Sequence, residues 1–258
     1  MGTSTWHRSP ETEAWRRVRE LYAQPDASPR EVVARIVAAL DPETRAGMSA
    51  PAPVTCLGTL VEGAQLVAAR GLAATLDHLG AGREPAAVQM AAGLRDRAER
   101  IIADEGFASR FGDLALEAVG TTALAIATLH SDGAGIMEVP LSVVEDDFAR
   151  FPREGRLHDV AALFVGHELD RSFRHFVARD VADFVGGEGL PTVSHANRLQ
   201  DAVAAHCREA RQALTLDDYE DALAPTLSVA PAERVALLHP VMAAAIGQGL
   251  AWLGAGGG

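Results

Sequence analysis

Cysteine is nearly absent from this sequence, and its scarcity limits the covalent and metal chemistry available to the chain. The 258 residues include two cysteines, Cys56 and Cys207, which lie far apart and form no CxxC pair. They cannot build a zinc site on their own, and one disulfide would be a weak framework for a chain of this length. We therefore expect a reducing compartment, the cytoplasm.

Basic charge is also in short supply, because 23 Lys and Arg residues face 35 Asp and Glu residues, for a formal net charge of −12. A protein that grips a nucleic-acid backbone normally carries a basic surface, since counterion release supplies much of its affinity. Nucleic acid is therefore not expected as the principal partner. No apolar segment follows Met1, so a secretory signal is not expected either.

Motifs that indicate a nucleotide-binding site or a serine hydrolase are missing from the sequence. It contains no GxGxxG, no P-loop and no GxSxG. We therefore predict no cofactor-binding residues.

Signals for helix starts are frequent, in a chain whose hydrophobic residues make up 48% of the total and are rich in alanine. The run Ser28-Pro29-Arg30-Glu31 combines a capping hydroxyl, a proline at the first helical position and a capping-box glutamate, and Asp41-Pro42-Glu43 is similar. Together with apolar periodicity, such signals predict an all-α, multi-helix globular array of about nine to ten helices. They fall near 10–23, 29–40, 57–79, 85–104, 110–129, 142–150, 157–185, 192–212, 216–223 and 231–253.

Two stretches are candidate linkers. Residues 47–54 contain two prolines, and residues 131–140 contain Gly133, Gly135 and Pro140. The overlapping stretch 136–141 is the one place where a short strand is expected. The second linker predicts an N-terminal helical lobe over 1–135 and a C-terminal lobe over 136–258. A single continuous domain is the alternative.

Polar residues interrupt the apolar face of the predicted helix 157–185. At about 100° per residue, Asp180 shares this face with three phenylalanines, and so does His158 if the helix is unbroken. On the next helix, His195 and His206 lie on the inward stripe. A buried carboxylate or imidazole without a partner costs several kcal/mol, so such groups are expected to be paired or bound to a metal.

These residues suggest two kinds of site. His158, Asp180 and His195 form a candidate ligand set for a divalent metal such as zinc or iron. Asp180 and His195 alone form a candidate acid–base pair, because antiparallel helices joined near residues 186–191 would bring them closest. His206 lies roughly 16 Å further along its helix and needs another partner. The alternative is that all four are core residues whose polar groups are hydrogen-bonded within the protein.

The opposite face of helix 157–185 is charged. It carries His167, Glu168, Arg171, Arg174 and His175, with acid–base pairs three or four residues apart, as in a solvated, ion-paired surface. The same residues are candidates for binding a protein partner or a second copy of this chain.

Residues 235–258 contain no charged side chain. We expect this segment to dock into the core or against a partner, and membrane contact is the less favoured alternative because glycines, His239, Pro240 and Gln248 interrupt it.

Three functions from different classes remain open on this evidence. The first is a helical interaction or scaffold protein. The second is a metal-dependent or acid–base enzyme of hydrolase-like type, built on the inward His/Asp cluster. The third is a regulator that binds a small ligand in an apolar pocket between helices.

Overall fold

The computed structural model describes residues 12–256 except 26, 132 and 134. About 80% of the structure is helical and the described residues form no strand, so the predicted all-α class is confirmed. The α-helices are, in chain order, α1 (Glu13–Tyr22), α2 (Pro29–Ala39), α3 (Pro42–Gly47), α4 (Pro51–Arg70), α5 (Leu72–Leu79), α6 (Ala86–Asp104), α7 (Arg110–Ala127), α8 (Leu141–Arg153), α9 (Leu157–Val181), α10 (Val193–Glu209), α11 (Glu220–Leu223) and α12 (Pro231–Gly254).

Short 3₁₀ helices replace two of the predicted elements. Residues 136–141 form no strand; the turn η1 (Ile136–Glu138) runs there instead and leads into α8. The predicted helix 216–223 is broken into η4 (Asp217–Tyr219) and the single turn α11. Like charges crowd this segment, because four of its residues are acidic, and repulsion disfavours a regular helix.

Local capping explains where several helices begin. The Asp41 carboxylate accepts a hydrogen bond from the backbone N–H of Thr44 at 2.6 Å, and Pro42 occupies the first position of α3, as the sequence predicts. Thr192 caps α10 in the same way. Ser28 stands before α2, but its hydroxyl makes no capping hydrogen bond to the described chain.

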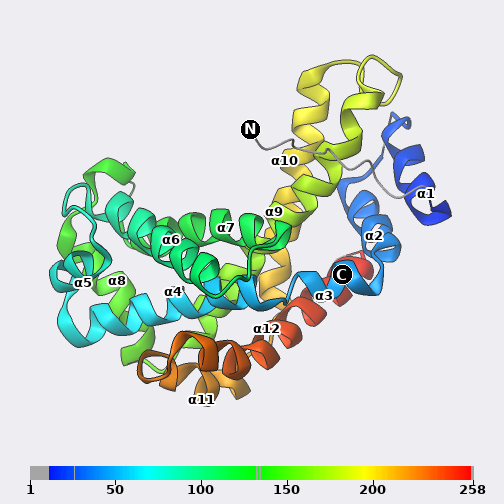
Figure 1. The fold of residues 1–258 in the computed structure, drawn as a ribbon. Coiled ribbons are helices and arrows are strands. Elements are labelled where there is room, and N and C mark those ends of the chain that lie inside the picture. The colour runs from blue at the N-terminus through cyan, green and yellow to red at the C-terminus, as the bar shows by residue number, and fades with distance from the viewer. Residues whose placement is uncertain (1–11, 26, 132, 134, 257–258) are drawn as a thin grey trace.

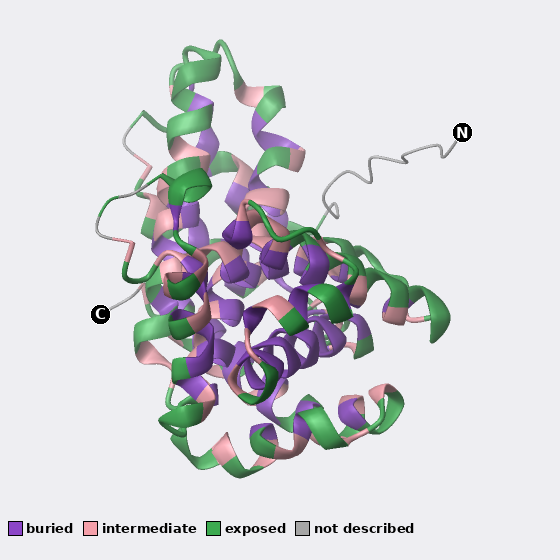
Figure 2. Ribbon diagram, turned by 90° about the vertical axis from the view of Figure 1, so that its left-hand side faces the viewer, coloured by how far each residue is buried: buried purple, intermediate pink, exposed green. Residues whose placement is uncertain are grey.

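The core is centred on α4, which is buried along almost its whole length and contacts α6, α7, α8 and α12. Buried residues gather in the middle of the molecule (Figure 2). Small residues let the helices approach closely. A side chain added at Gly63 would meet Leu94 of α6 at 2.5 Å, and one added at Gly58 would meet Arg234 of α12 at 2.8 Å. Helices from both sides of residue 135 take part in this packing, since α7 contacts α9 and α4 contacts both α8 and α12.

A buried ion network ties α4 to α6 and α12. The Glu62 carboxylate accepts two hydrogen bonds from Arg97, at 2.8 and 2.7 Å, and one from Arg234 at 3.0 Å. The side chains of Glu62 and Arg234 are each 6% exposed. Charges this well buried are stable only while they stay paired.

The pair α9 and α10 lies side by side and reaches toward α1 and α2 (Figure 1). The turn between them rests on the end of α1, where a side chain at Gly189 would collide with the Tyr22 carbonyl oxygen. Only glycine permits this close backbone contact.

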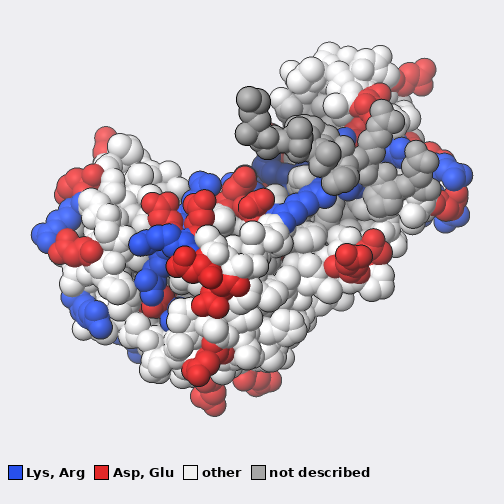
Figure 3. All heavy atoms as spheres, in the orientation of Figure 1, with Lys and Arg blue, Asp and Glu red and all other residues white. Residues whose placement is uncertain are grey.

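Two helical stretches, Pro42–Arg70 and Pro231–Gly254, are long and apolar enough to cross a membrane by length and composition alone. The most apolar window of the first is 83% buried within the fold, as in the core helix of a globular protein, and that of the second is 39% buried. One side of α12 packs on α2, α4 and α9. Its outer surface is largely free of charged side chains (Figure 3).

Candidate functional site

The predicted cluster of His158, Asp180 and His195 does not form. His158 and Asp180 occupy opposite ends of one continuous helix, α9, and 22 residues at 1.5 Å each separate them by roughly 33 Å. His195 lies exposed in the first turn of α10, where its Nδ1 is 2.8 Å from the Thr192 hydroxyl. The metal set is therefore wrong as a shared site, and the Asp180–His195 acid–base pair stays a prediction.

Asp180 and the first turn of α9 make contacts at opposite ends of that helix. Asp180 is 5% exposed and lies beside Arg179, whose guanidinium stacks over Trp15 at 4.8 Å. Glu220 accepts hydrogen bonds from the backbone N–H groups of Leu157 and His158, both at 3.0 Å, and so caps the start of α9.

The imidazoles of His158 and His206 are engaged as well. The Nδ1 of His158 lies 2.9 Å from Glu220. His206 is 4% exposed and stacks near Trp252 with ring centroids 5.0 Å apart. Across the described chain, no group of three His, Cys, Asp or Glu side chains has the geometry to hold a metal ion.

The predicted charged, solvated face of α9 is wrong at Glu168, because this side chain is fully buried. Neither of its carboxylate oxygens has a hydrogen-bond partner among the described residues. His167, Arg171, Arg174 and His175 are half-buried. The cause is that α9 packs against α7 on one side and α10 on another, with α4 and α12 also in contact, so little of it faces solvent.

Burial keeps two of these histidines neutral. It lowers the pKa of His167 to about 4. The charge of Asp170 opposes this shift, and the charges of Arg208 and Arg211 add to it. Burial likewise lowers the pKa of His175 to about 4, assisted by Arg110.

Acidification should therefore remove the stability that these two histidines contribute. Between pH of roughly 6.5 and 4 the unfolded imidazoles bind protons that the folded ones exclude, so stability present above pH 6.5 is lost as the pH falls. Urea unfolding at pH 7, 6 and 5 measures this slope, which should be shallower in His167→Gln. The exposed His195→Gln is the control, and identical slopes for all three proteins would contradict the assignment.

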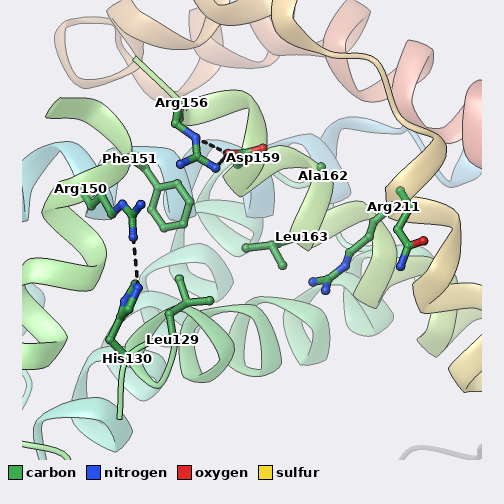
Figure 4. A pocket seen from close by; sticks show the side chains of 10 residues that line it. Leu129, His130, Arg150, Phe151, Arg156, Asp159, Ala162, Leu163 and Arg211 are labelled. Atoms are coloured by element: carbon green, nitrogen blue, oxygen red, sulfur yellow. Dashed lines mark hydrogen bonds and ion pairs between the residues drawn. The ribbon is translucent and has the colours of Figure 1, made fainter. Parts of the chain in front are cut away.

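Two adjoining hollows lie along α9 and share Leu163, Arg211 and Gln212; we call them together the α9 groove. Their volumes are about 400 and 360 Å³. The first is lined by Leu129, His130, Arg150, Phe151, Arg156, Asp159, Ala162, Leu163, Arg211 and Gln212 (Figure 4). The second adds Ala125, Gly166, His167, Ala205, Arg208 and Glu209.

Arginines edge the groove, although the chain as a whole is acidic. Arg150 pairs with Glu154 at 3.0 Å, Arg156 with Asp159 at 2.5 Å, and Arg208 with the buried Asp170 at 2.6 Å. Arg211 is exposed and has no ion pair or side-chain hydrogen bond within the described residues. Its guanidinium extends toward Leu163, in the middle of the hollow (Figure 4).

A histidine and an aspartate meet at the other end of the first hollow. Asp147 is 2% exposed, and its carboxylate lies 2.5 Å from Nδ1 of His130 and accepts the backbone N–H of the same residue at 3.3 Å. The Nη1 of Arg150 lies 3.1 Å from Nε2 of His130. The sequence analysis did not pair these residues, because they come from the end of α7 and from α8.

Sequence reasoning found His167 but missed the rest of this groove. The one usable signal was the basic run Arg150, Arg153 and Arg156, which follows an acidic helix start. Comparison with known proteins adds no relative: no protein-family model, curated protein or solved structure matches this chain significantly.

Proposed function

We propose that the α9 groove binds a small anion with an apolar body, such as a carboxylate or phosphate monoester. This is the small-ligand alternative among the three functions considered from the sequence. The observation that carries it is the free guanidinium of Arg211 over an apolar floor that includes Leu163 and Phe151. The first hollow, at about 400 Å³, lies within the usual range for small-molecule sites.

The charge pattern supports an anion over a neutral ligand. All 23 basic residues of the chain are arginines. A guanidinium presents a planar fork of donors that matches a carboxylate or phosphate with two parallel hydrogen bonds. Arg211 differs from Arg150, Arg156 and Arg208, which also line the groove, in having no acidic partner among the described residues, so its donors are available to an external anion.

The protein-partner reading of α9 remains a prediction with fewer residues to support it. Glu168 is buried, and the side chains of Arg171 and Arg174 are engaged, by Thr121 and by Asp170 and Asp201.

Calorimetric titration with octanoate, octyl phosphate and octan-1-ol tests the proposal. Octanoate and octyl phosphate should bind, and octanol should bind at least about tenfold more weakly, since it lacks the charge-assisted hydrogen bonds. Arg211→Gln should weaken octanoate binding by about 10- to 100-fold, because a hydrogen bond to a charged group contributes roughly 1.5–3 kcal/mol.

The matched control is Arg198→Gln, an exposed arginine of α10 that does not line the groove. It should leave the octanoate affinity unchanged. Absence of octanoate binding, or equal weakening by the two variants, would overturn the proposal.

A further inference from the structure

We propose that His130 and Asp147 form an acid–base pair that makes the α9 groove hydrolytic toward esters of the anion it binds. The inference rests on the proposed function for the substrate, but its geometry is independent of Arg211. Two observations carry it: the hydrogen-bonding state of the His130 ring, and the place of that ring in the hollow.

The contacts of His130 define its tautomer. Its Nδ1 lies 2.5 Å from the buried carboxylate of Asp147, which can only accept a hydrogen bond when ionised, so Nδ1 carries the proton. Its Nε2 lies 3.1 Å from Arg150, whose guanidinium has donors and no acceptor. Nε2 therefore accepts a hydrogen bond from Arg150 through its one lone pair. A neutral imidazole held in this tautomer by a carboxylate acts as a general base once that lone pair is released.

The ring stands at one end of the hollow and Arg211 at the other, with the side chains of Leu129, Phe151 and Leu163 between them (Figure 4). The His130 side chain is 58% exposed, while the Asp147 side chain behind it is 3% exposed. This arrangement fits an elongated substrate with an anionic group at Arg211 and an ester at His130. Half-esters of apolar dicarboxylic acids are the matching class.

The reaction would be a water-dependent ester hydrolysis. When the ester binds, the Arg150 guanidinium turns from Nε2 of His130 to the carbonyl oxygen, and the freed Nε2 takes a proton from water as the water oxygen bonds to the carbonyl carbon. The negative charge that develops on the carbonyl oxygen faces the Arg150 guanidinium, an electrostatic stabiliser beside the base. The bond from carbon to the alcohol oxygen then breaks, and the leaving oxygen takes the proton from Nε2. The products are a carboxylic acid and an alcohol, and His130 returns to its neutral form.

Hydrolysis of mono-4-nitrophenyl suberate, with 4-nitrophenyl octanoate as its uncharged counterpart, tests the inference. His130→Gln should lower kcat for both esters by at least about 100-fold, the usual lower contribution of a general base. Arg211→Gln should raise KM for the suberate half-ester alone. Because exposed histidines also cleave nitrophenyl esters slowly, His239→Gln is the control, an exposed histidine outside the groove whose loss should change neither rate.

Asp147 is a positioning residue, and its test separates that role from folding. Asp147→Asn should lower kcat with little change in KM, at a melting temperature that shows the variant is folded. His130 is mostly exposed, so His130→Gln is expected to fold even if Asp147→Asn does not.

The outcomes for binding and catalysis are distinguishable. If the protein binds octanoate but hydrolyses both esters no faster than His130→Gln, the acid–base pair is only a contact between α7 and α8, and the proposed ligand site stands. If octanoate does not bind, the proposed function fails whatever the hydrolysis rates are.

Discussion

Replacing Glu62 by alanine is expected to lower the free energy of unfolding by about 3–5 kcal/mol, because it leaves the buried guanidinium of Arg234 without its counter-charge. Burial alone would raise the pKa of the Glu62 carboxyl. The hydrogen bonds from Arg97 and the charge of Arg234 outweigh burial and hold that pKa below its ordinary value. The contribution of Glu62 is therefore present above pH of roughly 4.5 and lost as the pH falls through its folded pKa.

Urea denaturation at pH 7 measures this loss, and Asp77→Ala is the matched control. Asp77 pairs with Arg83 at 2.9 Å, but both side chains are more than half exposed, so its removal should cost less than about 1 kcal/mol. Replacing Glu62, Arg97 and Arg234 together by apolar residues of similar size should recover most of the stability. If the triple variant is no more stable than Glu62→Ala, packing rather than unpaired charge is the cause.

Replacing Glu168 by glutamine is expected to stabilise the protein increasingly as the pH rises. Glu168 is fully buried, and desolvation raises its pKa well above the ordinary value, so its carboxyl is neutral in the folded state. The unfolded carboxyl ionises near pH 4.5. Above that pH the unfolded carboxyl releases a proton that the folded one keeps, and the contribution of Glu168 to stability falls with rising pH by about 1.4 kcal/mol per unit up to the folded pKa.

Glu168→Gln lacks this penalty, because an amide of the same shape does not ionise. The difference in unfolding free energy between the variant and the natural chain should be small at pH 5 and grow through pH 6, 7 and 8. The control is Glu117→Gln on α7, whose side chain is 52% exposed, and which should give no such slope. Parallel stability profiles for the natural chain and Glu168→Gln would show that Glu168 is ionised in the fold.

The helices of this protein were predictable because their signals are local. Proline at the first position of a helix and the carboxylate of Asp41 act within one turn, and the structure has α3 where they predict it. Residues 216–223 show the limit of such signals. Their apolar spacing suggested a helix, but Glu220 is used to cap α9, a partner 62 residues away in the sequence.

The candidate site was less predictable because an interpretation from helix periodicity assumes that one face of each helix is exposed to solvent. α9 contacts neighbours on several sides, so Glu168 is buried on the side expected to be solvated. The predicted inward position of His195 is wrong for the opposite reason. His195 is exposed because it lies in the first turn of α10, next to the loop that joins α10 to α9. The His130–Asp147 contact joins the turn after α7 to the middle of α8, and no periodic pattern in the sequence indicates it.

The burial of α9 on several sides also fixes how long this helix can be. One inserted residue would turn everything after it by about 100° and advance it by 1.5 Å. Leu169 packs closely on Gly249 of α12, where an added Cβ would lie 2.7 Å from the Leu169 side chain. The insertion would move Leu169 away from this contact. It would also turn Glu168 away from its buried position. No new register restores all sides at once. Insertions and deletions in this fold therefore belong in the connecting segments, such as the one between α7 and α8, while α9 keeps a constant length.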